Sequence, residues 1–460
     1  MDVTRTDTGG GVPNPDDEVD VAVVGGGIAG LTAAHRLREE GRHPVVFEAE
    51  DAVGGRMRAR RVDGWTVEEG TETLATAGYP ATWRLVREVG LDSDGQVLKV
   101  RSLSGVWRDG RAHAGTGHWV GALTGAGLSL GGRMALARLV ASLLRSAGRF
   151  DTRRPGESPL GTRTVADLAA GRHRELLDYV LQPAVSTGWG WDPERSCVAP
   201  LVATMIATRG LLGWRTYRDG MDALARRMAE RLDVRCGRPV VEVKESGSGV
   251  RLGFADGTAL TARAVVLAVP SPLARALYPG APPHEERFLR AATYAPMIRV
   301  TCPVDRPLSA PQRRGTPRTY ALLVPDSEDG YISGLTFEHL KARNRAPDGH
   351  GLVSVLTSPR ATRELLHLTD EEITGAVLPR AERYAPGLGA ALRGASVHRH
   401  PHAAPEATPE ALRLHSAFLD RQAGGVEYAG DWVFQRPTSE AAVQSGELAA
   451  RRLLTGVLRG

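Results

Sequence analysis

The stretch Val19–Glu48 reads VDVAVVGGGIAGLTAAHRLREEGRHPVVFE and carries the pattern that decides the fold. A short apolar run ends at Gly25, which Gly27 and Gly30 follow in G-x-G-x-x-G spacing. A helical pattern comes next, and then a second apolar run that ends on Glu48. The first glycine permits a tight turn, the second lets the backbone approach a pyrophosphate, and the third lets helix and strand pack closely.

The acid at the end of the stretch adds to this pattern. Glu48 stands where a carboxylate accepts hydrogen bonds from an adenosine ribose and repels a 2′-phosphate. Glycine-rich turns also serve packing alone, but strand, glycines, helix, strand and acid within about thirty residues predict dinucleotide binding. Ile28 and Ala29 at the helix start, where free N–H groups face phosphates, and Ala49 after the acid complete the predicted contacts.

Composition narrows the class of protein. The chain has 460 residues, 42% of them apolar and 24% charged, which fits a soluble protein of two or three domains. Its formal net charge is +5, and only three of the 58 basic residues are lysines, namely Lys99, Lys244 and Lys341. The arginines are scattered among acids, so we expect no nucleic-acid partner.

Cysteine usage and the N-terminal segment bear on location. The three cysteines stand far apart and in no C-x-x-C spacing, which suits a reducing compartment and predicts neither a disulfide framework nor a metal site. Residues 1–18 are polar and rich in Gly and Pro, so we expect a disordered tail. No apolar run reaches about 18 residues. We therefore expect no membrane span and a cytoplasmic protein.

A second glycine element follows the ribose acid. Gly54-Gly55-Arg56 alone is a solvent turn as readily as a ligand loop. Directly after the fingerprint it favours a loop laid along the cofactor diphosphate, with Arg56 as the counter-ion.

The rest of the chain alternates helical and strand patterns. A hairpin is predicted to turn at Asp63-Gly64, and an apolar run closed by Pro270 is predicted to add a strand to the nucleotide-binding sheet. The expected helices are Tyr79–Gly90, Asp219–Leu232, Asp370–Tyr384, Gly387–Gly394 and a long one after Thr438; the expected strands lie in Gln96–Arg111, Asp233–Val243 (a strand pair), Val250–Phe254, Ala264–Val269, an antiparallel set within Ala292–Thr357, and Val426–Asp431.

Two segments allow alternative interpretations. Leu128–Phe150 has leucines and valine at helical spacing with interleaved arginines, which favours a core-facing helix over a membrane-surface helix. Ala184–Pro200 is dense in Gly, Trp and Pro, so we expect an ordered loop whose Trp189 and Trp191 either pack or line a cavity.

Three stretches, near the start, in the middle and near the end of the chain, resemble a known family. VAVVGGGIAGLTAA…VVFEAEDAVGGR, DGMDALARRMAERLDVRCGRPVVEV…ARAVVLAVP and VEYAGDWVFQRPTSEAAVQSGELAA resemble, in that order, FAD-dependent amine oxidase superfamily flavoproteins. The resemblance implies an α/β fold, with a Rossmann-type (glutathione reductase-like) FAD domain and an interleaved α+β substrate domain with a helical lobe. The implied FAD domain comprises residues 19–75, 219–275 and 415–460; the substrate domain comprises 76–218 and 276–414, with the lobe at about 121–182.

The resemblance also implies cofactor contacts. The fingerprint glycines and Glu48 would hold the ADP half, Gly55 and Arg56 the diphosphate, and Val240 the adenine side through its backbone. Gly70 and Thr71 match the segment that passes beside the flavin. Gly430 and Asp431 would bind the diphosphate–ribityl region. The start of the last helix, Ser439–Ala442, would direct N–H groups to the flavin, where a helix N-terminus stabilises negative charge.

Within the superfamily the chain resembles the protoporphyrinogen oxidase and phytoene desaturase-like branch. AVSTGWGWDPERS and GLTFEHLKARNRAPDG carry that likeness. The monoamine oxidase branch places an aromatic residue at the position of Thr438 and a lysine in the segment matching Thr293–Val300, and this chain has neither.

The function implied is that of an FAD-dependent oxidoreductase. FAD supplies hydride acceptance, so no catalytic base is required. We expect an oxidase or desaturase that dehydrogenates a C–C or C–N bond of a bulky small molecule in specialised-metabolite biosynthesis, with molecular oxygen or another electron acceptor. The alternatives are a protoporphyrinogen or coproporphyrinogen oxidase, a flavin-dependent isomerase, and a non-catalytic flavoprotein, against which the intact motifs argue. Oligomeric state stays open.

Two further groups are candidate site residues. Glu72 is either a substrate-facing carboxylate or a solvated turn residue. His398, His400 and His402 form an H-x-H-x-H pattern that suits metal ligation on one strand face, but no acid or cysteine stands at a fitting spacing, so we predict no metal.

Overall fold

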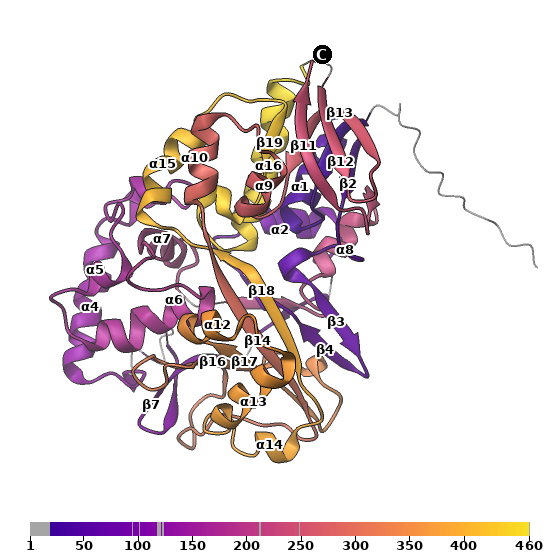
Figure 1. Cartoon of the computed structure of the whole chain (residues 1–460). Coiled ribbons are helices and arrows are strands. Elements are labelled where there is room, and N and C mark those ends of the chain that lie inside the picture. The colour runs from indigo at the N-terminus through magenta and orange to yellow at the C-terminus, as the bar shows by residue number, and fades with distance from the viewer. Residues whose placement is uncertain are drawn as a thin grey trace, which may run out of the picture.

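The computed structural model describes residues 19–93, 95–100, 102–116, 121, 124–210, 213–247 and 249–459. The tail predicted for residues 1–18 lies outside this range. Two seven-stranded sheets organise the described chain, one in the upper right of Figure 1 and one below it, with a helical lobe to the left. The fold is the mixed α/β class that the sequence predicts.

The first sheet has the strand order β10-β2-β1-β13-β12-β11, with β19 also paired to β13. Strands β10, β2, β1, β13 and β19 are parallel, and β12 and β11 extend the sheet in antiparallel fashion. The bounds are β1 (Val19–Val24), β2 (Pro44–Phe47), β10 (Asp233–Arg235), β11 (Val240–Ser246), β12 (Gly249–Phe254), β13 (Ala259–Leu267) and β19 (Val426–Tyr428).

This sheet confirms one prediction and corrects another. The apolar run before Pro270 forms β13, which pairs with β1 in parallel. The strand pair predicted within Asp233–Val243 is wrong, because β10 and β11 lie on opposite edges of the sheet. The chain between them crosses the end of β2, where the N–H groups of Gly237 and Arg238 donate to the carbonyls of Glu50 and Glu48.

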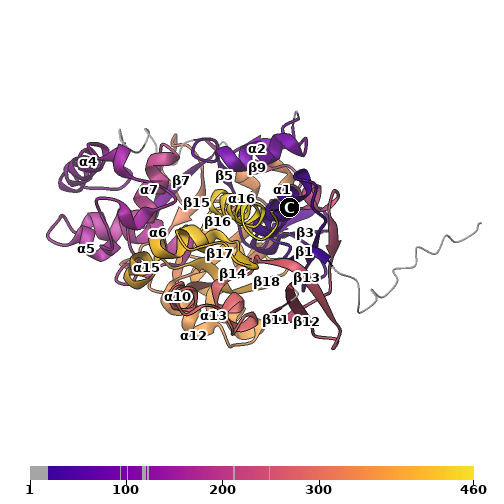
Figure 2. The ribbon, with the colours of Figure 1, turned by 90° about the horizontal axis from the view of Figure 1, so that it is seen from above.

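Two long helices cover one face of the sheet. Helix α1 (Ile28–Glu39) follows the glycine turn, and α16 (Ser439–Thr455) packs against it from the far end of the chain (Figure 2). A Cβ on Gly446 would lie 2.3 Å from the carbonyl oxygen of Ala29, so glycine is needed for this approach. Helix α2 (Pro80–Glu88) also packs on α16, and α8 (Ala223–Ala229), shorter than predicted, packs on α1.

The second sheet has the order β18-β14-β17-β16-β15-β7-β8. Its pairs are antiparallel, as predicted for Ala292–Thr357, except that β7 and β15 run parallel. The strands are β7 (Leu103–Arg108), β8 (Arg111–Ala114), β14 (Tyr294–Val304), β15 (Thr319–Leu323), β16 (Ile332–Phe337), β17 (Gly351–Thr357) and β18 (Ser396–Pro405). The helices of this part of the chain are α9 (Ser271–Leu277), α10 (Pro283–Ala291), α11 (Glu338–Lys341), α12 (Pro359–Leu365), α13 (Asp370–Ala381), α14 (Leu388–Ala391) and α15 (Pro409–Leu419).

Shorter elements connect the two sheets. The predicted hairpin is present as β3 (Ala59–Val62) and β4 (Trp65–Glu68), with Asp63 and Gly64 in the left-handed region at φ 49° and 84°. A three-stranded sheet joins distant segments through β5 (Leu74–Ala75), β9 (Trp214–Tyr217) and β6 (Val97–Lys99).

The helical lobe contains α4 (Leu130–Leu144), α5 (Val165–Ala169), α6 (Gln182–Trp189) and α7 (Ala199–Ala207). The loop predicted for Ala184–Pro200 is therefore wrong over its first part. A π-helical turn at Leu177–Leu181 runs directly into α6, so the helical path continues through Pro183. Trp189 and Trp191 pack edge to face, 4.7 Å between ring centroids.

Helix α4 confirms the predicted core-facing side in part. Leu139 is buried, and Leu136 and Leu143 pack beside it in the core of the lobe. In contrast, Leu130 is 72% exposed, Met134 48% and Leu144 60%. These exposed residues recur at helical spacing on the side of α4 that its neighbours leave uncovered. Among the described residues, no helix is both long and apolar enough to cross a membrane.

Candidate functional site

The glycine turn between β1 and α1 forms the first part of the site. Gly25 has a φ of 108° and its N–H donates to the carbonyl of Phe47 at 2.8 Å. A Cβ on Gly30 would lie 2.1 Å from the carbonyl oxygen of Gly25, so this glycine serves close packing. A Cβ on Gly27 would meet nothing within 4 Å, so this glycine borders open space. The turn thus fits the approach of a pyrophosphate, beside Ile28 and Ala29.

Glu48 lies directly below this turn, at the carboxyl end of β2. Its carboxylate accepts hydrogen bonds from the N–H of Gly26 at 2.7 Å and of Glu50, across Ala49, at 3.0 Å. These bonds fix the carboxylate at the edge where dinucleotides bind in such sheets. Val240 begins β11 at the far edge and pairs with Phe254. Contacts of Glu48 and Val240 with the adenosine half remain predictions.

Arg56 and Asp431 form the second part. They come from segments 375 positions apart, yet Arg56 Nη1 and Nη2 donate to Asp431 Oδ2 and Oδ1 at 2.7 Å each. Burial opposes the charge of Arg56, but Asp431 and then Tyr294 outweigh it, so its pKa is raised. Gly430 has a φ of 146°, and a Cβ there would lie 2.5 Å from Trp432 Nε1. The structure therefore joins two predicted cofactor residues in one bidentate ion pair.

The segment predicted to pass beside the flavin runs next to this pair. The N–H of Thr71 donates to the carbonyl of Arg56 at 2.9 Å, and Arg299 Nη1 donates to the carbonyl of Gly70 at 3.2 Å. A Cβ on Gly70 would lie 2.4 Å from the carbonyl oxygen of Arg56. Gly70 therefore permits the two backbones to run close together, and Gly55 precedes the same loop at a φ of 51°.

A buried ion cluster holds the next residue, Glu72. Arg299 on β14 bonds Glu72 at 2.6 Å and Glu338 at 2.5 Å, and Lys341 bonds both Glu338 and Glu68. We call the set the six-residue ion cluster; its members are Glu68, Glu72, Arg299, Glu338, Lys341 and Arg345, the last bonded to Glu68 at 2.8 Å. The cluster contains three carboxylates and three cations. No local sequence pattern reveals it, because its members come from three segments, 68–72, 299 and 338–345, that are far apart along the chain.

Glu72 is the member of the cluster closest to open space. Its side chain is 16% exposed, whereas the other five are 0–4% exposed. Burial raises the pKa of Glu72, against the opposing charge of Arg299, and Thr336 Oγ1 donates to its Oε1 at 3.1 Å. The interpretation as a solvated turn residue is wrong, because the carboxylate is paired and largely buried. A substrate-facing role remains a prediction.

The start of α16 forms the third part. Thr438 caps the helix, since its Oγ1 accepts from the N–H of Ala441 at 3.1 Å. Ser439 is half-buried, and Ala442 closes the first turn with a bond from its N–H to the carbonyl of Thr438. Glu440 points away from this end and accepts the N–H groups of Ala81 and Thr82 at the start of α2.

The three histidines lie on β18, beside the site. His398 and His400 are opposite Arg299 and Met297 of β14. His400 Nε2 donates to the carbonyl of Glu69 at 2.8 Å, and the His402 ring packs edge to face on Tyr294. Burial, followed by the charge of Arg299, lowers the pKa of His398 to about 4. The histidines therefore contact different groups and support the flavin-side segment.

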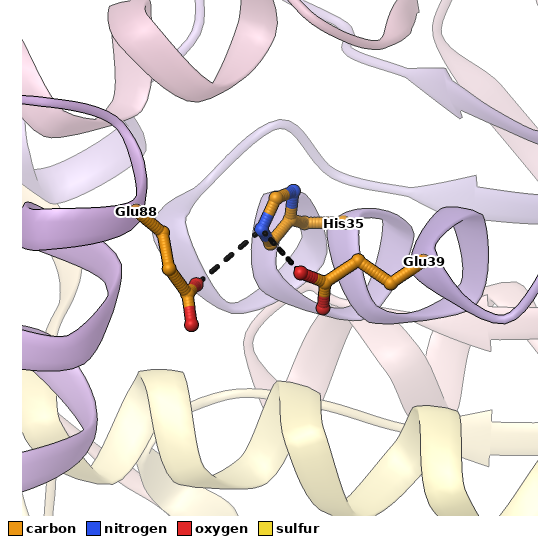
Figure 3. A group of neighbouring side chains, drawn as sticks. All are labelled: His35, Glu39 and Glu88. Carbon is orange, nitrogen blue, oxygen red and sulfur yellow. Dashed lines mark ion pairs between the residues drawn. The ribbon is translucent and has the colours of Figure 1, made fainter.

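A separate group, His35, Glu39 and Glu88, brings three candidate metal ligands together (Figure 3). His35 Nε2 lies 3.5 Å from Glu39 and 3.4 Å from Glu88. Arg36 occupies the same carboxylates, at 2.6 Å from Glu39 and 3.0 Å from Glu88. A fixed positive charge there opposes a metal ion, so the group is an ion-pair cluster between α1 and α2.

Fold and site together define a dinucleotide-binding α/β protein whose site combines a glycine turn, an Arg–Asp pair and a helix start. A family model described as flavin containing amine oxidoreductase matches residues 28–454. The chain belongs to this family, and it is an oxidoreductase with FAD as cofactor.

Relatives differ in their named activities. Coproporphyrinogen III oxidase of Propionibacterium freudenreichii subsp. freudenreichii is 29% identical over 443 residues, covering 82% of this chain and 79% of that protein. Mitochondrial protoporphyrinogen oxidase of Nicotiana tabacum is 28% identical over 176 residues, which cover 38% of this chain and only 33% of that protein. The match thus spans about a third of the tobacco enzyme.

Solved structures show the same fold. Putrescine oxidase with bound putrescine superposes with a TM-score of 0.76 at 19% identity, covering 96% of this chain and all of that one. A putative protoporphyrinogen oxidase from Exiguobacterium sp. 255-15 gives a TM-score of 0.72 at 19% identity, covering 97% of this chain and 100% of that one.

Proposed function

We propose that the chain is an FAD-dependent oxidase or desaturase that dehydrogenates a C–C or C–N bond of a bulky small molecule in specialised-metabolite biosynthesis. The observation that supports it most is the Arg56–Asp431 pair. It brings the glycine-arginine loop, the flavin-side segment at Gly70–Thr71 and the turn before α16 to one place. These are the segments that a dinucleotide flavin needs around its diphosphate and ring.

When bound, FAD supplies the hydride-accepting chemistry. The chain supplies position and charge. The start of α16 directs backbone N–H groups toward negative charge, and Arg299 and His400 hold the flavin-side segment through the carbonyls of Gly70 and Glu69. Glu72 presents a carboxylate with a raised pKa beside that segment and is the group we assign to face the substrate.

A second candidate is coproporphyrinogen or protoporphyrinogen oxidation. It is favoured by the 29% identity to coproporphyrinogen III oxidase over 443 residues. Both candidates use a small-molecule substrate and an electron acceptor such as molecular oxygen.

One experiment separates these candidates. The purified holoenzyme is mixed without oxygen with amines, porphyrinogens and polyenes in turn, and loss of flavin absorbance near 450 nm identifies a reducing substrate. Oxygen is then admitted and peroxide is measured. Bleaching by a porphyrinogen supports the second candidate, and bleaching by another compound supports the first. Product formation without net oxidation would instead indicate an isomerase, and a protein that takes up no FAD would exclude all three.

We also propose a weak membrane-surface contact through α4. Its exposed Leu130, Met134 and Leu144 lie on a stretch, 130–149, with four arginines and no acidic residue. Sedimentation with vesicles containing anionic lipid tests this proposal. Leu130→Gln with Leu144→Gln should release the protein, and binding that persists unchanged in that double variant would contradict it.

A further inference from the structure

Arg436, in the turn before α16 (Gly430–Thr438), is a buried cation that meets no ion-pair or hydrogen-bond partner for its side chain in the described part of the chain. Its side chain is 2% exposed, and its Nε and Nη2 are buried and donate to no group among the described residues. Nearly all buried polar groups in folded proteins have partners, and a guanidinium cannot avoid the cost by losing its proton. A buried arginine with two open donors therefore indicates that an acceptor belongs beside it.

Neighbouring acids do not fill this role. The carboxylate of Glu440 is taken up by the N–H groups of Ala81 and Thr82 and by the side chains of Thr82 and Gln444. Asp431 is used by Arg56. Burial lowers the pKa of Arg436, and the nearby Tyr79, Glu440 and Asp151 offset burial only in part.

The backbone fixes Arg436 at the helix start. Gln435, fully buried, has a φ of 51°, a left-handed conformation that costs a non-glycine residue roughly 1–3 kcal/mol. The N–H of Arg436 donates to the carbonyl of Asp431 at 3.2 Å, and its carbonyl accepts from the N–H of Thr438 at 2.8 Å. Gln435 ends the short helix Asp431–Phe434 in this conformation, and strained residues of this kind cluster at ligand sites.

The start of α16 adds a second attraction for negative charge. The helix has 17 residues, and its first N–H groups carry the positive end of the helix dipole. Pro437, Thr438 and Ser439 are only half-buried, whereas Gly430–Arg436 are buried. Arg436 stands two residues before Thr438, the residue that caps the helix, and its charge acts on the Tyr79 hydroxyl that neighbours Thr438.

We propose that Arg436 and the first turn of α16 form an anion site that takes a negatively charged, hydrogen-bond-accepting oxygen. Two sources have this chemistry: the pyrimidine oxygens of FAD and a carboxylate of the substrate. The proposal rests on the proposed function for the presence of FAD. The test measures binding and needs no substrate. A negative result for the anion site can therefore be told apart from a failure to find a substrate.

The test compares Arg436→Met and Arg436→Lys with Arg153→Met, which removes an exposed arginine near Phe434. Three constants are measured: the Kd of the apoprotein for FAD, the Kd of the holoenzyme for sulfite from flavin bleaching, and the Kd for propionate from the flavin difference spectrum. A lost charge-assisted hydrogen bond weakens binding by about tenfold or more. Arg436→Lys should recover part of any loss, since it keeps the charge.

The outcome assigns the source. A weaker Kd for FAD or sulfite in Arg436→Met shows that the site holds an oxygen of the cofactor, and loss of propionate binding alone shows a site for a carboxylate. All three constants within twofold of those of Arg153→Met would overturn the proposal.

Stability of the apoprotein gives an independent measurement. An unpaired buried charge is costly, so Arg436→Met should raise the melting temperature of the apoprotein while weakening one of the three constants. A lower melting temperature with all three constants unchanged would show that Arg436 serves only the fold, and would also overturn the proposal.

Discussion

The six-residue ion cluster and the turn before α16 both contain buried arginine, but they differ in whether that arginine has an ion-pair partner. In the cluster every cation meets a carboxylate from another segment, so charge is balanced inside the protein. In the turn, two buried donors of Arg436 meet no acceptor within the part of the chain that the structure describes. The difference is one of ion pairing: each cation of the cluster is paired with a carboxylate of the chain. The charge of Arg436 is the one that our proposal pairs with a ligand.

The largest expected effect comes from removing one cation of the six-residue ion cluster. Lys341→Met leaves Glu68 and Glu338 without their shared cation in a site with no solvent exposure. Removing one partner of a buried pair costs about 3–5 kcal/mol. Urea unfolding should show this loss, while Lys99→Met, at an exposed lysine, should stay near the wild type. Equal stability of the two variants would contradict a structural role for the cluster.

The next effect is a pH dependence of stability. It comes from His415, a buried histidine that holds the turn before α16. His415 is fully buried, and its Nε2 donates to the carbonyl of Val433 at 2.8 Å. Burial, followed by the charge of Arg154, lowers its pKa to about 4. Because the unfolded chain takes up the proton first, stability is present above about pH 6.5 and is lost as the pH falls toward 4.

The free energy of unfolding should therefore fall as the pH falls from 6.5 to 4. His415→Gln should remove part of this fall, up to about 3 kcal/mol. His398 loses stability in the same window, so some slope should remain. Urea unfolding at several pH values measures it, with exposed His284→Gln as the control. If the unfolding free energy of His415→Gln depends on pH as that of the wild type does, His415 is not held in its neutral form by burial.

A smaller effect distinguishes the glycine of the G-x-G-x-x-G motif that serves packing from the one that serves FAD binding. Gly30→Ala places a Cβ 2.1 Å from a backbone oxygen and should destabilise the apoprotein by about 1–3 kcal/mol. Gly27→Ala meets no atom within 4 Å and should leave apoprotein stability unchanged while weakening FAD binding. Thermal unfolding and FAD titration measure the two properties. Equal loss of stability in both variants would show that Gly27 also serves packing.

The smallest expected effect concerns the ribose acid. Glu48→Ala should weaken the Kd for FAD by about tenfold, which is about 1.4 kcal/mol. Glu50→Ala is the matched control, because the side chain of Glu50 is 71% exposed. Equilibrium dialysis against FAD gives both constants. If the Glu48→Ala protein retains its yellow cofactor as well as the control, the placement of the ribose contact is wrong.

Local patterns predicted much of the fold. The β1–α1–β2 unit, the hairpin at Asp63-Gly64 and α16 were predicted from short-range spacing, because glycine conformation and helical periodicity are properties of neighbouring residues. The loop predicted for Ala184–Pro200 is wrong over Ala184–Trp189, because a single glycine does not end a helix and Gly188 lies inside α6. Periodicity predicted the core-facing side of α4 at Leu136, Leu139 and Leu143. It did not predict that Leu144 stays exposed, because periodicity does not show which neighbours cover a helix.

The sequence by itself determined the cofactor class, since the G-x-G-x-x-G glycines, the acid Glu48 and the glycine-arginine loop follow one another within one short segment, where local spacing fixes their order. Only the tertiary structure decided how charges are balanced. Arg56 meets Asp431, and Lys341 meets Glu68, across separations that no local pattern records. The same holds for Arg436, whose missing partner becomes visible only when the surrounding chain is in place. Pairing inside a protein depends on burial and proximity, and folding alone creates both.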